Sequence, residues 1–361
     1  MPSIVVVCAV LMAYTPVYIG VISMKINQAK ACKIEAPCKI NLHLGIGEKR
    51  PDGFHTLESL FAALALGDSL CFERTGTEGE TVLLMDWEIP GEPVSPEDNL
   101  VFKAVSLFRE QTQFKSGLRI SVTKRIPAGA GLGGGSSDAA SSLLALNVLS
   151  GAALPPEELM KIAAFLGSDV PFFLSGGVAY VRGRGEIIET VKTPLDFWVI
   201  LIKPPFSSTT AAAFRLLDQA RKSKTRGNTG GTPPGREELL QALSGKIEAW
   251  PFYNDFMPLF LNSRLSSPME GSNLPYAPKA RVYRAIFDAL RETGAAFSGL
   301  SGSGSCCFGI FNSKEEAEKA VKELTQGKSP LFQNGEGSPN QGYFVRLTFF
   351  LASRPIPVVQ Y

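Results

Sequence analysis

The chain contains 361 residues, of which 45% are hydrophobic and 19% are charged, so it can form a sizeable core and is long enough for two domains. Its 36 Lys and Arg against 34 Asp and Glu leave a net charge of +2, which excludes a protein that attracts nucleic acid or an anionic membrane by bulk charge. Six scattered cysteines without CxxC spacing and only two histidines exclude a paired-cysteine zinc site and a three-histidine metal centre, and they predict reduced thiols in a cytoplasmic protein.

The N-terminal region is apolar. No charged residue occurs from Met1 to Met24, and the run is long enough to resemble a membrane span. No basic segment precedes it and Pro16 interrupts it, so a secretory signal fits poorly. We interpret residues 1–26 as an apolar extension. An over-called start codon, with a true start at Met24, is preferred over a packed extension, and a membrane anchor is the least favoured explanation.

Residues 27–195 are expected to form a first domain that mixes strands and helices. Residues 34–44 have the pattern of a strand, which carries Lys39 and Asn41 toward a turn rich in Pro, Asp and Gly. A later strand is predicted from the alternation of Leu118, Ile120 and Val122. The patterns predict strands over 81–87 and 117–124 and helices over 99–111, 136–149 and 154–167.

Residues 196–361 are expected to form a second domain. It begins with a buried strand over 196–205, and a polar loop rich in Gly and Pro follows near 220–240. Helical patterns then cover 283–294 and 315–326, with a second glycine turn and a strand between them. The second domain therefore also mixes helices with sheet.

The segment PAGAGLGGGSS joins a predicted strand to a predicted helix. Its glycines allow several backbone amides to converge on one anion at the positive end of the helix, where a side chain would block the approach of a phosphate. It lacks the GK[ST] of a Walker loop and the context of a dinucleotide fold, so alone it indicates only phosphate binding. The candidate residues are Pro127, Ala128, Gly129, Ala130, Gly131, Leu132, Gly133, Gly134, Gly135, Ser136 and Ser137.

The segment PAGAGLGGGSSDAA resembles the ATP loop of the GHMP kinase superfamily, named for galactokinase, homoserine, mevalonate and phosphomevalonate kinases. The blocks APCKINLHLGIGEKRPDGFHTL, LGSDVPFF and LSGSGSCCFGIF are similar to the branch that phosphorylates a cytidine diphosphate sugar alcohol in the non-mevalonate isoprenoid pathway. The likeness covers about residues 33–310. It implies the α+β, two-domain GHMP kinase fold, with an N-terminal ribosomal-protein-S5-like domain and a C-terminal ferredoxin-like domain.

The same resemblance implies an ATP-dependent kinase that uses Mg²⁺ and transfers a phosphoryl group to the 2-hydroxyl of its acceptor. Lys39 in PCKINL and Asp169 in GSDVP stand where these kinases carry a catalytic lysine and aspartate. Phosphoryl transfer to an alcohol requires a base for the hydroxyl proton and positive charge near the attacking oxygen. We therefore expect Asp169 to be the base and Lys39 to activate the nucleophile, and we assign no residue as a metal ligand.

Three residues are candidates for binding the acceptor. Phe54 offers an aromatic face to a pyrimidine ring, and His55 offers a directional hydrogen bond to the edge of that ring. Members of this branch often carry tyrosine where Phe54 stands, so stacking is retained and a phenol hydrogen bond is lost. Asn41 shares a strand face with Lys39 and is expected to hold acceptor hydroxyls or the diphosphate. Asp138 fits a helix cap better than a catalytic role.

Weaker indications concern the second half of the chain. The second glycine turn, Gly299–Gly304, would let backbone approach the acceptor or its phosphates. Phe206 with Thr209 or Thr210 is a further candidate for the cytidine pocket. Asn254 and Asp255 are expected to be structural.

Two other functions remain open at this point. Another kinase of the superfamily, acting on homoserine or mevalonate, is disfavoured by the GFH segment, and a non-catalytic nucleotide or sugar sensor is disfavoured by the presence of both Lys39 and Asp169. In either case the expected partner is a small molecule. Nucleic acid and membrane are not expected partners, and the chain is expected to be a monomer or a homodimer.

Overall fold

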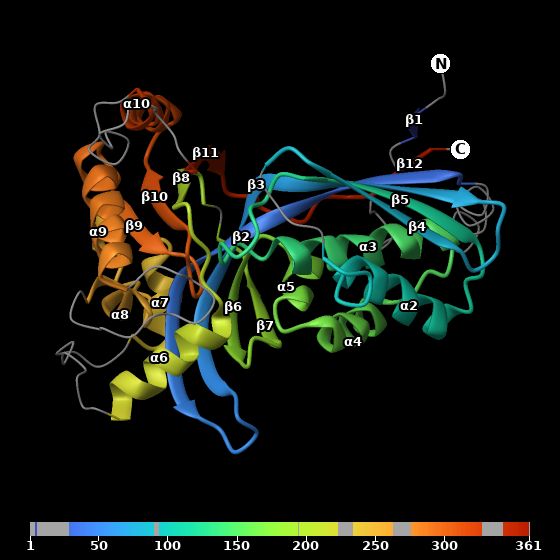
Figure 1. Ribbon diagram of the computed structural model, residues 1–361, viewed down its shortest axis with the longest axis horizontal. Helices are drawn as coiled ribbons and strands as arrows, with labels where there is room; N and C mark the ends of the chain where they lie inside the picture. Colours follow the sequence, from blue (N-terminus) through green and yellow to red (C-terminus); the bar gives the residue numbers. More distant parts are fainter. Residues whose placement is uncertain are drawn as a thin grey trace.

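Two long antiparallel strands, β2 (Ala31–Lys49) and β3 (His55–Thr75), run through both halves of the molecule (Figure 1). The computed structural model describes residues 4–5, 29–89, 94–193, 195–222, 234–262, 276–326 and 342–360. Shifts in the β2–β3 register occur just before Cys38, just after Asn41 and between Ile46 and Lys49. The strand predicted over 34–44 is thus the middle of a longer one, because β3 supplies hydrogen-bond partners on both sides of it.

The first sheet is built around β3. In the described part of the chain it has eight strands, in the order β1-β12-β2-β3-β5-β4, and the first half of β3 also pairs with β6, which pairs with β7. β4 lies parallel to β5 because a helix connects them, whereas the other pairs are antiparallel. The remaining strands are β1 (Ile4–Val5), β4 (Thr81–Trp87), β5 (Gly117–Lys124), β6 (Val178–Gly183), β7 (Ile187–Val191) and β12 (Val358–Gln360).

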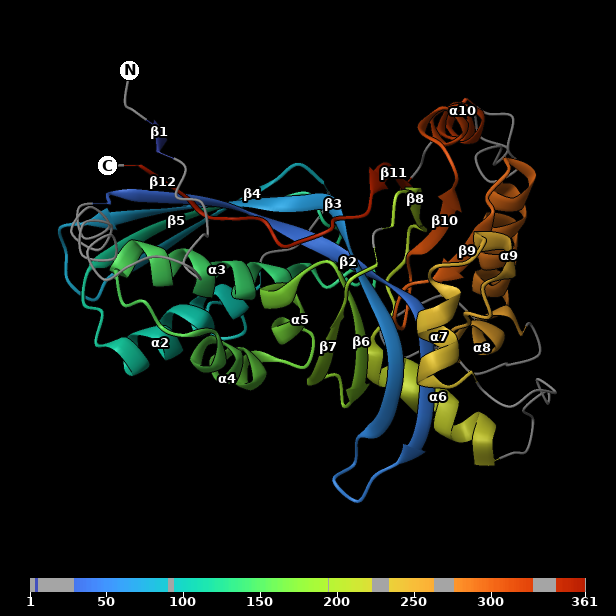
Figure 2. The ribbon, with the colours of Figure 1, turned by 180° about the vertical axis from the view of Figure 1, so that it is seen from behind.

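Helices cover one face of this sheet, as the views from both sides show (Figures 1 and 2). They are α2 (Leu100–Thr112), α3 (Gly134–Ser150), α4 (Pro156–Leu166) and α5 (Val170–Ser175). The three helices predicted from the sequence are confirmed here as α2, α3 and α4. The side chain of Asn99 accepts a hydrogen bond from the Val101 amide and so starts α2 at the expected place. Phe72, Phe108 and Phe172 are fully buried in the apolar layer between helices and sheet.

The second half of the chain forms a separate antiparallel sheet in the order β11-β8-β10-β9. The strand predicted over 196–205 is β8, and the helices predicted over 283–294 and 315–326 are parts of α9 and α10, which pack on this sheet. Its strands are β8 (Trp198–Lys203), β9 (Phe297–Leu300), β10 (Cys307–Phe311) and β11 (Phe344–Phe349). Its helices are α6 (Thr210–Lys222), α7 (Arg236–Ala242), the 3₁₀ turn η1 (Ile247–Ala249), α8 (Met257–Leu261), α9 (Tyr276–Glu292) and α10 (Lys314–Thr325).

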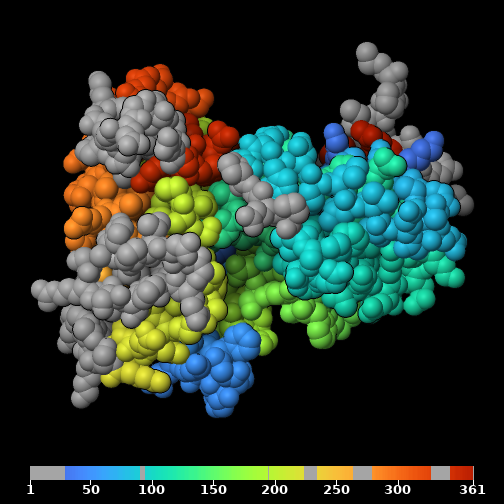
Figure 3. Space-filling view, in the orientation of Figure 1, coloured from blue at the N-terminus to red at the C-terminus, as the bar shows by residue number. Residues whose placement is uncertain are grey.

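An apolar core joins the two sheets. Ile40 and Leu42 of β2 lie in one cluster with Leu201 of β8 and Phe308 of β10, and all four are buried. The change from the first sheet to the second falls between β7 and β8, but β12 returns to pair with β2. In the space-filling view the surface is hollowed where α6, in yellow, faces the green segments of the first half (Figure 3). The two sheets and the helices that pack on them confirm the predicted α+β class.

Two expectations from the sequence fall mainly outside the described residues. Only Ile4 and Val5 of the apolar extension 1–26 are described, and they form β1. Of the polar loop near 220–240, residues 223–233 lie outside the description, while its two ends belong to α6 and α7. Among the helices that are described, none is both long and apolar enough to cross a membrane.

Candidate active site

The glycine-rich segment lines a cavity of about 350 Å³. Pro127 to Ser136 all contribute to its wall, whereas Ser137 is fully buried and does not. Gly133 precedes α3 with a φ of +73°, a left-handed conformation that favours glycine. No side chain caps α3, so the first N–H groups of this helix are available to an anion at the positive end of its dipole. The local geometry is therefore that of a phosphate site.

Apolar side chains form another part of the wall of the same cavity. It is formed by Met85 and Trp87 at the end of β4 and by Leu100 at the start of α2. Apolar and aromatic walls of this kind suit a flat base, while the glycine segment suits phosphate oxygens. The cavity can thus hold both ends of a nucleotide.

Lys39 and Asp169 meet beside the end of the glycine segment. Their Nζ and Oδ2 atoms are 3.5 Å apart, with Lys39 buried and the Asp169 side chain 35% exposed. Asp169 is the N-cap residue of α5 but makes no capping hydrogen bond, so its carboxylate is not used by the helix. A Cβ on Gly133 would lie 3.3 Å from Cγ of Lys39, which places the pair next to the phosphate site. The two predicted residues are adjacent, and their catalytic roles remain a prediction.

A buried network holds the Lys39 ammonium in place. Its Nζ donates to Oδ1 of Asn41 at 2.6 Å and lies 4.5 Å from the centre of the Phe61 ring. Nδ2 of Asn41 donates in turn to Oγ of Ser59 at 3.0 Å. Both polar atoms of the Asn41 side chain therefore have protein partners, one of which is Lys39, and the expected contact of Asn41 with the acceptor stays a prediction.

The second glycine turn packs directly against the first. Oγ of Ser301 donates to the carbonyl of Gly131 at 2.8 Å, and a Cβ on Gly131 would overlap the Ser301 carbonyl group. Asn254 holds the second turn from behind, because its Nδ2 donates to the carbonyl groups of Leu300 and Gly302, both at 2.8 Å. Asn254 therefore has a specific structural role: it holds the second glycine turn, which packs on the first through Ser301.

A buried charge cluster lies beneath the glycine segment. Lys124, at the end of β5, pairs with both Asp68 and Asp138, and all three side chains are buried. Asp68 also accepts hydrogen bonds from the amides of Arg125 and Ile126, at 2.5 and 2.8 Å, and so shapes the entry to the segment. The expected helix cap at Asp138 is wrong: Gly133 is the N-cap residue, and Asp138 lies one turn into α3, where its Oδ2 accepts a hydrogen bond from Lys124.

Two ionised carboxylates beside one lysine would leave a net negative charge in a buried place. Burial raises the pKa of the Asp138 carboxyl to about 8, although attraction to Lys124 opposes the rise. The folded protein therefore keeps a proton on this group at pH values where the unfolded chain, with a pKa near 3.8, has released it. The stability associated with this proton is present below about pH 4 and is lost as the pH rises through 8.

We predict that Asp138→Asn removes this pH dependence. Between pH 6 and 8 the free energy of unfolding of the wild type should fall by about 2 kcal/mol more than that of the variant, because one proton is released only by the native state. Urea unfolding at both pH values measures the difference. Equal slopes for the two proteins would show that Asp138 is ionised throughout this range.

The hairpin residues predicted to bind the acceptor behave differently from each other. Phe54 is 52% exposed, and the guanidinium of Arg184 lies 5.1 Å from the centre of its ring, so this phenylalanine is not part of a core. His55 is buried, its ring stacks on Phe214 at 5.0 Å, and its Nε2 lies 2.8 Å from Oδ1 of Asp218. The hydrogen bond expected from His55 to a pyrimidine edge is therefore not available at Nε2.

The weaker candidates lie around the second glycine turn. The hydroxyl groups of Thr210 and Ser303 are 3.2 Å apart, and the Phe206 ring packs edge-on against Tyr283 at 5.5 Å. A further cavity of about 490 Å³ lies against the β2–β3 hairpin, and Asn41, Phe54 and His55 do not line it. Its wall includes Gly45, Gly47, Glu58, Tyr253 and Asp255.

Comparison with known proteins supplies the family. The family described as "GHMP kinases N terminal domain" matches residues 99–177, and "GHMP kinases C terminal" matches residues 256–328. The chain is 37% identical over 293 residues to the 4-diphosphocytidyl-2-C-methyl-D-erythritol kinase of Thermodesulfovibrio yellowstonii, and the match covers 81% of this chain and 93% of that relative. The chain belongs to the 4-diphosphocytidyl-2-C-methyl-D-erythritol kinase family. It is accordingly a kinase with the two-domain GHMP fold and uses ATP.

Solved structures agree with this assignment. A crystal structure of 4-(cytidine 5'-diphospho)-2C-methyl-D-erythritol kinase superposes with a TM-score of 0.63 at 28% identity, covering 91% of this kinase and 98% of that chain. The L. major mevalonate kinase in complex with R-mevalonate superposes with a TM-score of 0.62 but at 15% identity, covering 89% and 96% of the two chains. The second likeness shows a shared fold alone.

Several residues of the site were not predicted from the sequence. Lys124 could have been found, because it continues the alternation of Leu118, Ile120 and Val122 and so points to the buried side of β5. Asp68 could not, because nothing near it in the sequence shows that it meets a lysine 56 positions away. The apolar wall of the nucleotide cavity and the partners of His55 likewise come from elements that are distant in the sequence.

Proposed function

We propose that this kinase transfers the γ-phosphoryl group of ATP to the 2-hydroxyl of 4-diphosphocytidyl-2-C-methyl-D-erythritol. The observation that carries the proposal is the contact between Lys39 and Asp169 at the end of the phosphate-binding segment. The turn after Arg184, whose side chain covers Phe54, approaches the same place, since a Cβ on Gly185 would lie 3.1 Å from that of Ser168. This geometry supports a transfer between a nucleotide in the cavity and an acceptor whose base stacks on Phe54.

The arrangement supports a single transfer step. The acceptor O–H bond breaks and its proton passes to the Asp169 carboxylate, while the freed oxygen bonds to the γ-phosphorus and the bond from that phosphorus to the β–γ bridging oxygen breaks, so that ADP leaves. The Lys39 ammonium, fixed by Asn41, stabilises the negative charge that develops on the attacking and transferred oxygens. The N–H groups at the start of α3 hold the phosphates still during the transfer.

We also propose Mg²⁺ as the companion of ATP. The chain offers oxygen donors of the type that this ion prefers: Ser136 and Asp138 line the cavity, and Oδ1 of the buried Asp138 has no hydrogen-bond partner among the described residues. When bound, the ion neutralises part of the phosphate charge. A cytoplasmic location is proposed because the five described cysteines, Cys32, Cys38, Cys71, Cys306 and Cys307, are all free thiols.

A substrate panel tests the proposed reaction. ATP consumption should depend on 4-diphosphocytidyl-2-C-methyl-D-erythritol, and mevalonate and homoserine should give no turnover above background. The product should carry one added phosphoryl group, which mass spectrometry measures. Turnover of mevalonate or homoserine without turnover of the cytidylyl acceptor would reject the proposal. ATP binding without any acceptor-dependent consumption of ATP would favour a non-catalytic sensor.

A further inference from the structure

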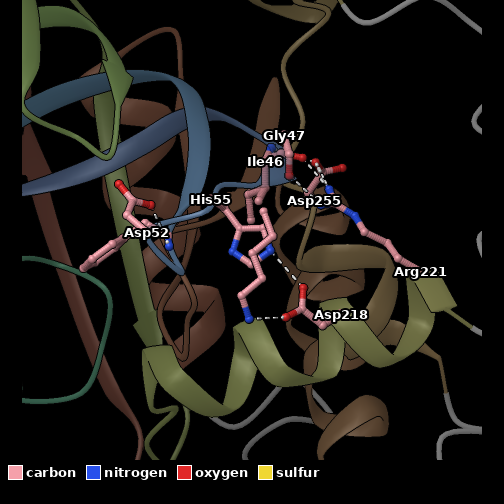
Figure 4. A network of polar contacts seen from close by, with 9 residues as sticks. Ile46, Gly47, Asp52, His55, Asp218, Arg221 and Asp255 are labelled. Atoms are coloured by element: carbon pink, nitrogen blue, oxygen red, sulfur yellow. Dashed lines mark hydrogen bonds and ion pairs between the residues drawn. The ribbon is translucent and has the colours of Figure 1, made fainter.

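One face of α6 contacts the end of the β2–β3 hairpin (Figure 4). Phe214, Asp218 and Arg221 follow one another at helical spacing along that face. Phe214 stacks on the His55 ring with an angle of 18° between the planes, and Asp218 pairs with His55. One turn further on, Arg221 donates to the carbonyl of Gly47 at 2.6 Å. A helix of the second half therefore determines how a hairpin of the first half is held.

The contact between Asp218 and His55 differs from an ordinary surface ion pair. The His55 side chain is 4% exposed, and it contacts both the ring of Phe214 and the carboxylate of Asp218. A carboxylate only accepts, so Nε2 must carry the proton that it donates to Asp218. This fixes both the orientation of the ring and the identity of the protonated nitrogen. The other contact of Asp218, to Lys49 at 3.2 Å, is more exposed and weaker in its consequences.

The contacts that hold His55 lie next to Phe54, the residue expected to stack on the pyrimidine of the acceptor. His55 directly follows Phe54, the exposed ring beneath Arg184, so the orientation of one residue constrains the backbone of the other. The first residue of α6, Thr210, lies against Ser303 of the second glycine turn. The same helix thus touches the hairpin that carries Phe54 and the turn that packs on the phosphate-binding segment.

We infer that Asp218 is a positioning residue for acceptor recognition, which holds His55 in one orientation and so presents the Phe54 end of the hairpin to the pyrimidine of the acceptor. The inference rests on the proposed function. Asp218 does not touch the reacting atoms, and it lies outside the lining of the nucleotide cavity. Its loss should therefore affect the acceptor and leave both ATP binding and the chemical step unchanged.

Steady-state kinetics of three variants test the inference. Asp218→Ala should raise KM for the cytidylyl acceptor about tenfold, the loss of one hydrogen bond to a charged group, while kcat and KM for ATP stay within about twofold. Asp218→Asn should recover much of the loss, because its amide oxygen can still accept from Nε2. Lys49→Met removes the other partner of Asp218 and is the matched control, with an expected KM close to that of the wild type.

The tautomer of His55 provides a second readout that does not depend on activity. Because the chain has only His43 and His55, ¹⁵N spectra of the imidazoles can be assigned with one His43→Gln variant. Wild-type His55 should show a protonated Nε2, and Asp218→Ala should lose this preference. An unchanged acceptor KM in Asp218→Ala, with normal wild-type turnover, would overturn the inference alone. Absence of wild-type turnover with the cytidylyl acceptor would overturn the proposed function and the inference together.

Discussion

Asp169→Asn is expected to lower kcat by about 10² to 10⁴-fold, the range associated with removing a general base. The amide that replaces the carboxylate cannot take the acceptor proton, although it keeps the shape of the side chain. KM for ATP should stay within about twofold, because Asp169 does not line the nucleotide cavity. Folding should be preserved, since the Asp169 carboxylate makes no capping hydrogen bond in α5 and is partly exposed.

The matched control for this variant is Asp288→Asn. Asp288 lies on α9, where it forms an exposed pair with Arg291 at 2.6 Å, so the same chemical change occurs far from Lys39. Its kcat should equal that of the wild type. Circular dichroism and unfolding midpoints of both variants check that neither change acts through folding. Near wild-type turnover by Asp169→Asn would remove this residue from the role of base.

Gly131→Ala is expected to lower the free energy of unfolding by about 2 to 4 kcal/mol. Gly131 has a φ of +74°, which L-residues rarely adopt, and a Cβ there would overlap the carbonyl group of Ser301. The atoms that this Cβ would meet belong to the backbone, so they cannot move aside without displacing the second glycine turn. The two glycine turns would have to separate, and ATP affinity should fall with stability, as urea unfolding and calorimetric titration would measure.

Gly135→Ala in the same segment is the control. A Cβ on Gly135 would meet only Cδ1 of Leu100, at 3.9 Å, and this glycine lies in the first turn of α3 without a left-handed φ. Its stability should equal or slightly exceed that of the wild type, because alanine is the better helix former. If both variants lost the same stability, close packing of the two turns would not be the reason that Gly131 is needed.

Local signals in the sequence predicted most elements of the fold. Asn99 marks the start of α2, Pro155 precedes α4, and Gly167 follows it, because caps and helix breakers act over a few residues. The sequence underestimated the length of β2. The polar residues at its C-terminal end stay in the strand because they pair with β3. Pairing between distant segments leaves little trace in the sequence of either one.

The residues of the candidate site also differ in whether local sequence could reveal their role. Lys39, Asp169 and the glycine segment were identified from the sequence, and the structure brings them together. The prediction for Asp138 was wrong because its position suggested a local cap, whereas a lysine from a neighbouring strand determines its environment. His55 was identified from the sequence as a candidate for binding the acceptor, which stays a prediction. Its partner on α6 is 163 positions away, so no local pattern could reveal that its Nε2 contacts Asp218.

The unbroken pair β2–β3 restricts how this molecule can deform. Where two domains are joined by a flexible linker, closure over a ligand is a rotation about a hinge. Here a change in the angle between the two halves must twist a hydrogen-bonded ribbon, and the ribbon is irregular just before Cys38, just after Asn41 and between Ile46 and Lys49. Lys39 lies between the first two of these irregularities. A change in that angle would therefore move Lys39 relative to the glycine segment, because Lys39 lies in an irregular part of the ribbon.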